Sequence, residues 1–397
     1  MRILVGWDKA NEAETIDLVL NVDGNSATVT TDGDQFAELL NTGRWDVIVI
    51  TLNFPEESQA YPRFVALRER LPNVPVLGAW RSGEIVQLAR FISAGLRTNI
   101  SRDAAGEYLF LLLYLVESTY AATLAERARQ LAERLREEVD SVRRLQESVI
   151  PHDLPAPKGY HVAARYEPSQ IRVLGDNPVV MAGGDYYDVF NLDDKHLVLL
   201  VGDASGHGVK ACMSIMTMHT LIRMIRDRQF PDAGAFVSEV NRRLSDNDIV
   251  RDQGGFITLL YCVLDTSEHR LQWSAAGHPM PLLQNLDTNH IGPVAGDESS
   301  GLPLGIDGEW PYDVNTIEIP ARHRLLLYSD GLDEAFPDGE TNDEQFGIAG
   351  IIRSLKSSAH LPVEAALDKL FVDSNAATRG SGRADDTTAV LLERSTE

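Results

Sequence analysis

Residues 117–150 contain neither glycine nor proline and are rich in charged side chains. A stretch of this length without a helix breaker predicts one long helix. Pro151 and Pro155 follow it and end it, because proline cannot continue a helix. The regions on either side of the helix have different strand patterns. We therefore expect the 397-residue chain to form more than one domain, as its length also indicates.

Apolar residues along this helix recur at alternating spacings of three and four, and only Glu138 interrupts them. This heptad pattern over about four repeats predicts a coiled coil, so we assign residues 119–152 to a dimerisation helix and expect a parallel homodimer. The alternative is an amphipathic helix packed on its own domain. The apolar positions are Ala121, Leu124, Ala128, Leu131, Leu135, Val142, Leu145 and Val149.

The N-terminal region, residues 1–118, alternates short apolar runs with helical patterns. Near-continuous apolar strands joined by crossover helices are typical of a buried parallel sheet. We therefore predict an α/β doubly wound domain. The expected strands are 2–5, 47–51 and 74–79, and the expected helices are 12–20, 35–41, 61–70 and 84–93.

This region resembles the receiver domain of response regulators, and residues 46–55 are similar to its third strand and following loop. Thr51 stands where that family has its phospho-accepting aspartate, Trp80 at the Ser/Thr switch position and Arg102 at the lysine position. Of the acidic pair only Asp8 remains. A threonine cannot form an acyl phosphate, and a single carboxylate is a poor Mg²⁺ ligand set. The resemblance implies a degenerate receiver-like domain, which acts either as a spacer or dimerisation module or as a sensor of a partner or small ligand.

The C-terminal region, residues 153–397, is rich in short strand patterns with a few longer helical ones. Such a mixture predicts an α+β domain, a layered β-sandwich with helices on the outside. The expected strands are 162–166, 179–182, 197–201, 255–265, 270–275, 314–318, 324–328 and 389–392, and the expected helices are 211–226, 234–247 and 363–374.

Four short segments that carry aspartate lie at or near the ends of apolar runs in this region. Hard carboxylates at strand ends, beside glycines that let the backbone approach, are what an oxygen-ligated Mg²⁺ or Mn²⁺ site requires. Taken alone, Asp330 before Gly331 has a simpler role as a turn former, and Asp203 as a helix cap. The segments are 183–188, 202–208, 329–331 and 384–388.

These segments belong to an ordered series that resembles the bacterial sporulation-phosphatase (SpoIIE-type) branch of the PPM metal-dependent Ser/Thr protein phosphatases. The resemblance covers residues 146–393 and rests on GGDYYD, GDASGHG, SAAGHPMPLL, GLPLG, YSDGLDEAFPDGE, FG and ADDTTAVLL. It implies a catalytic centre of two Mn²⁺ or Mg²⁺ ions in which Asp203 bridges both. The implied ligands are Asp185, Asp203, the carbonyl of Ala204, Asp330 and Asp385.

Two divalent ions lower the pKa of a water between them and offset the charge of a phosphoryl group, so no cysteine or serine nucleophile is needed. The resemblance assigns no general acid and no phosphate-binding arginine. The residues whose roles stay open are Asp188, Asp386, His207, His278, Arg165 and Arg172.

The resemblance implies a signalling phosphatase that hydrolyses phosphoserine or phosphothreonine on a protein, an anti-sigma-factor antagonist, by attack of a metal-activated hydroxide. Residues 145–151 resemble the helix that switches the metal site in this branch, so we expect regulation through the N-terminal domain. The alternative is a non-enzymatic adaptor, a pseudophosphatase that binds a regulatory partner.

The net charge of −23 argues against a nucleic-acid-binding surface, which requires a basic face. Cys212 and Cys262 lie in apolar segments without metal-ligand spacing, which favours buried, reduced thiols. The most apolar stretch, 108–116, is shorter than the roughly 20 residues that span a bilayer, and no secretory signal pattern is present. We therefore expect a cytoplasmic protein without a membrane partner.

Overall fold

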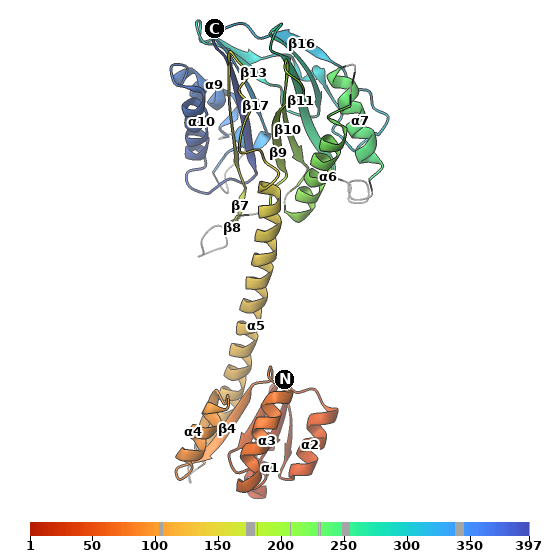
Figure 1. Ribbon diagram of the computed structural model, residues 1–397. Coiled ribbons are helices and arrows are strands. Elements are labelled where there is room, and N and C mark those ends of the chain that lie inside the picture. The colour runs from red at the N-terminus through yellow and green to blue at the C-terminus, as the bar shows by residue number, and fades with distance from the viewer. Residues whose placement is uncertain are drawn as a thin grey trace. The chain divides into compact units, whose positions relative to one another are not determined.

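The computed structural model describes residues 1–102, 106–171, 179–180, 182–206, 208–228, 230, 232–247, 255–337 and 345–396. The chain forms two compact units, Met1–Arg134 and Leu135–Glu397. Helix α5 (Tyr108–Glu147) contributes residues to both units (Figure 1).

The N-terminal unit is built on a five-stranded parallel sheet in the order β2-β1-β3-β4-β5. This order, with one reversal of direction, is that of a doubly wound α/β fold. The resemblance to a receiver domain stays a prediction. Alternate strand residues pack against helices on opposite faces of the sheet. The strands are β1 (Arg2–Gly6), β2 (Ser26–Thr30), β3 (Val47–Thr51), β4 (Val76–Arg81) and β5 (Thr98–Arg102), and the helices before α5 are α1 (Ala10–Leu20), α2 (Gly33–Thr42), α3 (Glu57–Arg70) and α4 (Ile85–Ser93).

Helix α5 begins at Tyr108, earlier than the expected start near Glu117. Tyr108, Leu112 and Val116 follow one another at four-residue spacing and are buried against the sheet. This spacing places them on one face of a helix, so the apolar stretch is the first part of α5 and not a separate segment. Farther along α5, Leu131 is 60% exposed and Leu135 is 58% exposed, so the predicted coiled-coil seam faces away from the N-terminal unit.

By length and composition alone, α5 is also a helix that could cross a membrane. It contains an 18-residue window with a mean hydropathy of 1.4, of which 17% is buried. Core helices of soluble proteins pass the same test, so this feature is weak evidence for a membrane span.

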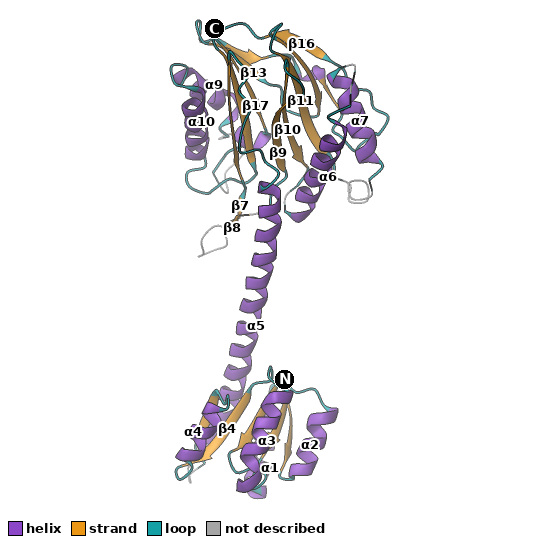
Figure 2. Ribbon diagram, in the orientation of Figure 1, coloured by secondary structure: helices purple, strands orange, loops and turns teal. Residues whose placement is uncertain are grey.

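In its described residues, the C-terminal unit contains two sheets of five or more strands, and these lie between helices (Figure 2). The order of the first sheet is β15-β12-β11-β10-β9, with β16 paired to β12, and that of the second is β14-β13-β17-β18-β6. The first consists of β9 (Asp185–Asn191), β10 (His196–Ala204), β11 (Ile257–Asp265), β12 (Arg270–Ala276), β15 (Ser300–Gly301) and β16 (Asn315–Glu318), and the second of β6 (Tyr160–Glu167), β13 (Leu282–Asn285), β14 (Ile291–Pro293), β17 (His323–Tyr328) and β18 (Thr387–Arg394).

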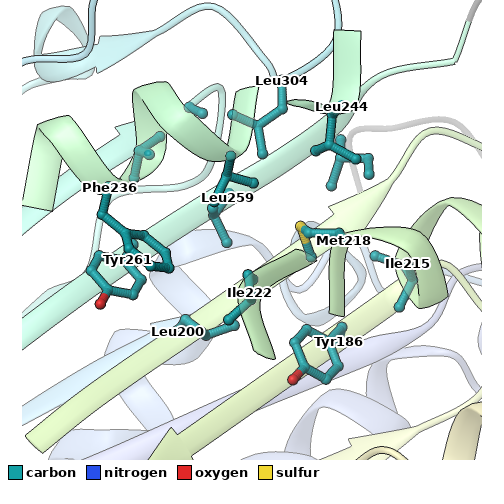
Figure 3. Packing of buried hydrophobic residues seen from close by; sticks show 14 of the residues in the cluster. Tyr186, Leu200, Ile215, Met218, Ile222, Phe236, Leu244, Leu259, Tyr261 and Leu304 are labelled. Atoms are coloured by element: carbon teal, nitrogen blue, oxygen red, sulfur yellow. The ribbon is translucent and has the colours of Figure 1, made fainter. Parts of the chain in front are cut away.

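Alternation along the strands sorts the side chains of this unit into three cores. Leu199 and Val201 of β10 point between the two sheets, whereas Val198 and Leu200 point to the first helical layer. Figure 3 shows this outer packing, where Ile222 and Phe236 meet strand residues. The predicted layered sandwich is present. The helices are α6 (Val209–Ile225) and α7 (Ala233–Ser245) on the first sheet, and α9 (Gly347–Ser357) and α10 (Val363–Ala377) on the second.

Two details of the C-terminal unit differ from the sequence prediction. The strand expected at 179–182 appears as the two residues of β8 (Val179–Val180), paired with β7 (Gln170–Ile171). Met181 and His207 lie outside the described residues. Both cysteines are buried and unpaired, as expected.

Candidate metal centre

Asp185 and Asp203 face each other across the β9–β10 hairpin. The two strands pair antiparallel, and Asp185 is directly opposite Asp203 in the register. Side chains of directly opposed residues lie on the same face of a sheet, so the two carboxylates are neighbours. The Ala204 amide donates to the Gly184 carbonyl over 2.9 Å and continues the ladder one step beyond this pair.

Asp330 and Asp385 come from the second sheet. Asp330 begins the short η2 helix (Asp330–Leu332) directly after β17, and Asp385 lies in the loop that enters β18. Strands β17 and β18 are paired neighbours, so these two loops meet at one end of the sandwich. The charges of Asp185, Asp330 and Asp385 all act on Asp203. The structure thus brings together the four predicted carboxylates, which are up to 200 positions apart (Asp185 to Asp385).

Burial, joined by the charges of neighbouring carboxylates, raises the pKa values of Asp185, Asp203 and Asp385. Burial, followed by the charges of Asp185 and Asp330, raises the pKa of Asp203 to about 10. Burial and then the charge of Asp386 raise the pKa of Asp185 well above its usual value. Burial is also the main cause that raises the pKa of Asp385 to about 6. Such a cluster binds a cation strongly once ionised, because the cation offsets the repulsion.

Glycines let the backbone approach the cluster closely. A Cβ atom on Gly184 would lie 2.6 Å from the Ala204 carbonyl oxygen and 3.0 Å from Asp203 Oδ1. The Ala204 carbonyl and the Asp203 carboxylate therefore border the same space, as the predicted ligand set requires. A Cβ on Gly183 would lie 2.0 Å from Asp386 Oδ2. Both positions exclude any side chain.

The donor set fits hard divalent cations. Every group in it is a carboxylate or carbonyl oxygen, and six or more such oxygens are what Mg²⁺ and Mn²⁺ prefer. In the part of the chain that the structure describes, no three acidic, histidine or cysteine side chains lie as close together as the ligands of one ion do.

Gln146, near the end of α5, is a site residue that sequence reasoning missed. Its side chain is fully buried, and its Nε2 donates to the Asp185 carbonyl over 3.0 Å. Its Oε1 accepts from the Gly183 amide over 2.7 Å. One side chain of α5 thereby satisfies two main-chain groups of the segment that carries Asp185. The only signal in the sequence was the position of Gln146 at the start of the region of family resemblance.

Asp386 and Ser329 support the cluster from the second sheet. Asp386 is 1% exposed, and its carboxylate accepts from the Ser169 amide over 2.7 Å and from the Gly184 amide. Ser329 Oγ donates to Asp185 Oδ2 over 2.6 Å and accepts from the Thr388 amide over 2.9 Å. These bonds tie the loops of the two sheets together. The sequence left the role of Asp386 open. In the structure its carboxylate fixes the main chain at Ser169 and Gly184 through hydrogen bonds.

Asp188 lies on the opposite face of β9 from Asp185. Its Oδ2 pairs with Arg223 Nη2 of α6 at 2.9 Å and accepts from Tyr186 Oη over 2.9 Å. His219 Nδ1 lies 2.7 Å from the same tyrosine hydroxyl. This network joins α6 to β9 and does not belong to the carboxylate cluster.

Two other candidates with open roles, His278 and Arg165, are not in the cluster either. His278 is buried, its Nδ1 lies 2.8 Å from Thr258 Oγ1, and burial lowers its pKa to about 3, so it is neutral. Arg165 pairs with Asp368 at 2.7 Å and with Glu167 at 2.6 Å. Arg172 and His207 lie outside the described residues.

The carboxyl edge of the N-terminal sheet carries an ion-pair network. Thr51 is fully buried at the end of β3. Arg102 Nη1 lies 2.7 Å from Asp8 Oδ1 and 3.3 Å from Glu12 Oε2, and Arg81 lies 3.4 Å from Asp8. The acidic residue of this edge is therefore already paired with two guanidinium groups within its own unit.

A profile of the family described as "Stage II sporulation protein E (SpoIIE)" matches residues 193–395. The match contains Asp203, Asp330 and Asp385 and begins after Asp185. Protein IcfG of Synechocystis is 24% identical over 282 residues, which cover 65% of this chain and 41% of IcfG. Phosphoserine phosphatase RsbU of Bacillus subtilis is 23% identical over 256 residues, covering 63% of this chain and 70% of RsbU. The chain thus spans less than half the length of IcfG.

Two solved structures share the fold of the C-terminal unit. The RsbU and RsbW domains of Rv1364c from Mycobacterium tuberculosis superpose with a TM-score of 0.50 and 25% identity, covering 62% of this chain and 63% of that one. The SiaA-PP2C domain of Pseudomonas aeruginosa superposes with a TM-score of 0.52 and 15% identity, covering 66% of this chain and 98% of that one. At 15% identity, the similarity to the SiaA-PP2C domain indicates a shared fold alone.

Proposed function

Because the chain belongs to the stage II sporulation protein E family, we propose that its C-terminal unit is a metal-dependent protein phosphatase acting on phosphoserine or phosphothreonine. The observation that carries the proposal is the meeting of four carboxylates from separate segments at one end of the sandwich. Two relatives, RsbU and RsbP of Bacillus subtilis, are named phosphoserine phosphatases, which agrees with this activity.

Asp185, Asp203, the Ala204 carbonyl, Asp330 and Asp385 are the groups that would hold two Mn²⁺ or Mg²⁺ ions. When bound, such ions supply a water of lowered pKa and neutralise phosphoryl charge. The pKa values of Asp203 and Asp185, raised by burial and then by neighbouring carboxylates, support this assignment, since a bound cation would favour the ionised carboxylates.

The chain's own residues orient these ligands. Ser329 holds one oxygen of Asp185 through its hydroxyl, so the other oxygen would be the one to bind an ion. Asp386 and Gln146 bond to backbone on either side of Gly183 and Gly184, which holds the loop against the hairpin. A site fixed in this way loses little free energy to rearrangement during the reaction.

The N-terminal unit is, in this proposal, a receiver-like input domain that works without phosphorylation. Thr51 offers no carboxylate and is buried, and Arg102 already neutralises Asp8. Its signal passes through α5, whose residue Gln146 bonds to the segment carrying Asp185. Helix α5 thereby links the input domain to the proposed active site.

We infer a parallel homodimer in which α5 pairs with its copy. The exposed side chains Leu124, Leu131 and Leu135 occupy the expected seam. Phe110 and Tyr114, which are 88% and 66% exposed, precede that seam in the same heptad register. This pairing accounts for the apolar window of α5 without a bilayer, so the protein is cytoplasmic in this proposal. The substrate is a phosphorylated anti-sigma-factor antagonist, as the family resemblance implies.

The test is hydrolysis of a phosphoserine peptide by the full chain with and without Mn²⁺. Metal-dependent turnover in the wild type, lost in Asp203→Ala and kept in the exposed control Asp227→Asn, would support the proposal. Peptide binding without turnover at any Mn²⁺ concentration, with Asp203→Ala equal to the wild type, would contradict it and favour the adaptor.

A further inference from the structure

A pocket of about 290 Å³ lies in the N-terminal unit, away from the ion-pair network of that unit. Its lining includes Val76, the first residue of β4, and Thr98, the first residue of β5, so it opens at the amino edge of the sheet. Thr51 and Arg102, in contrast, end their strands at the carboxyl edge. The outer wall of the pocket is the middle of α5, from Thr119 to Gln130.

Three arginines from three different elements line this pocket. Arg68 comes from α3, Arg97 from the turn before β5 and Arg127 from α5. Burial and then the positive charge of Arg97 lower the pKa of Arg68, so two guanidinium groups lie close together. In a chain with a net charge of −23, such a gathering of cations is unusual.

The acid in the lining does not neutralise these arginines. Among the described residues, Glu126 is the one acidic side chain of the pocket. Its carboxylate pairs with Arg129 at 3.5 Å and accepts from Gln130 over 3.0 Å. The described part of the chain places no carboxylate within 4.0 Å of Arg97, Arg68 or Arg127.

Internal hydrogen bonds hold the pocket in shape. Arg68 donates to the Val74 carbonyl from Nη1 and to the Pro72 carbonyl from Nη2, each over 2.9 Å. Arg127 donates to the Asn73 carbonyl, and Thr119 Oγ1 donates to Thr98 Oγ1 over 3.2 Å. The loop before β4 and the middle of α5 are thus tied together around the cationic space.

We propose that this pocket binds a small molecule carrying a phosphate group. Guanidinium groups present paired donors that match phosphate oxygens, and the Thr98 hydroxyl, which accepts from Thr119, adds a further donor. The volume is near the lower limit for ligand pockets, which favours a small ligand. Because α3, the turn before β5 and α5 each contribute an arginine, a bound ligand holds this part of α5 against the rest of the N-terminal unit. An effect of this ligand on catalysis rests on the proposed phosphatase function. The binding of the ligand does not depend on that function.

The test is calorimetric titration of the full chain with inorganic pyrophosphate in buffer without divalent cations, so that the carboxylate cluster does not take part. We expect saturable binding that weakens at least tenfold in Arg97→Gln and further in Arg97→Gln combined with Arg127→Gln. Arg134→Gln, an exposed control on α5 outside the pocket lining, keeps the wild-type affinity. Arg97→Gln is the variant to interpret first, because Arg127 also bonds to the loop.

Hydrogen exchange gives a second measurement that does not depend on enzyme activity. Bound pyrophosphate is expected to slow exchange of amides in residues 119–130 of the wild type and not of Arg97→Gln. Absence of saturable binding, or equal weakening in Arg134→Gln, would overturn the proposal. The binding and exchange measurements do not depend on the phosphatase assay, so the pocket proposal and the phosphatase proposal can each be contradicted without the other.

Discussion

At the scale of single residues, the buried amide of Gln146 offers the sharpest test of the metal centre. Gln146→Ala leaves the Gly183 amide and the Asp185 carbonyl without their partner. Each buried unsatisfied group costs about 1–3 kcal/mol. If about 2 kcal/mol falls on the transition state, turnover of a phosphoserine peptide drops roughly 30-fold. The control is Gln59→Ala, whose exposed amide bonds only to Glu56. Equal turnover in the two variants would show that the bonds of Gln146 do not matter for catalysis.

Gly183 gives a second prediction at this scale. In Gly183→Ala the new methyl group would lie 2.0 Å from Asp386 Oδ2, so one of the two must move. Overpacking of this kind costs about 1–3 kcal/mol, and we expect a lower urea midpoint for the C-terminal unit. Gly292→Ala is the matched control, since its nearest neighbour is 3.7 Å away. An unchanged midpoint in Gly183→Ala would mean that the loop is looser than its contacts indicate.

The sequence predicted the carboxylates of the site better than the residues that hold them. Asp185, Asp203, Asp330 and Asp385 stand in recognisable motifs, and the structure brings them together. Ser329 lies in one of these motifs and Gln146 at the start of the region of resemblance, but the sequence indicates no role for either, because their roles depend on which groups lie opposite them in the folded chain. Hydrogen-bond partners 39 and 144 positions apart follow from tertiary structure and not from local pattern.

At the scale of elements, α5 yields a prediction about assembly. Leu131→Lys places a charge in the expected seam, where burial against a second helix would be costly. We expect the measured mass in sedimentation experiments to fall from that of a dimer to 43.8 kDa. Glu133→Lys adds the same side chain two residues away, off the seam, and is expected to remain dimeric. A monomeric wild type would contradict the coiled coil.

Elements with strong apolar patterns were predicted well, and those without were missed. Strand β3 matches its expected range, because five consecutive apolar or β-branched residues leave few alternatives. Strand β2 has the sequence SATVT and α9 begins at a glycine, and neither shows clear periodicity. The predicted start of α5 lies too far along the sequence, because the apolar first turns of the helix and its charged remainder follow different patterns.

At the scale of the whole molecule, the two compact units should unfold separately. Calorimetry of the full chain is expected to show two transitions, of which Mn²⁺ raises only that of the C-terminal unit. At 100 times its dissociation constant, a ligand adds about 2.7 kcal/mol. Addition of a chelator reverses this shift. A single transition that moves as a whole with Mn²⁺ would contradict independent units.

Acid is expected to destabilise the N-terminal unit through its ion-pair network. Burial opposes ionisation of Asp8, but the hydrogen bond to Arg102 together with the charges of Arg102 and Arg81 lowers its pKa below 3.8. Burial also opposes ionisation of Glu12, but the hydrogen bond from Trp7 together with the charges of Arg102, Lys9 and Arg81 lowers its pKa below 4.5. A carboxylate with a lowered pKa stabilises the fold above its unfolded pKa and loses that contribution as the pH falls. Below about pH 4.5 the N-terminal transition therefore moves to lower temperature. Arg102→Gln should abolish most of this dependence.

The position of β18 in the second sheet has a consequence for the order in which the protein is made. This strand lies between β17 and β6, although in sequence it follows every other strand. On a nascent chain, β6 and β17 are synthesised first and present unpaired edges until residues 387–394 emerge. Asp385 and Asp386 emerge just before that strand. Translation therefore delivers the N-terminal unit and α5 early, and completes the carboxylate cluster only at the last step of sheet assembly.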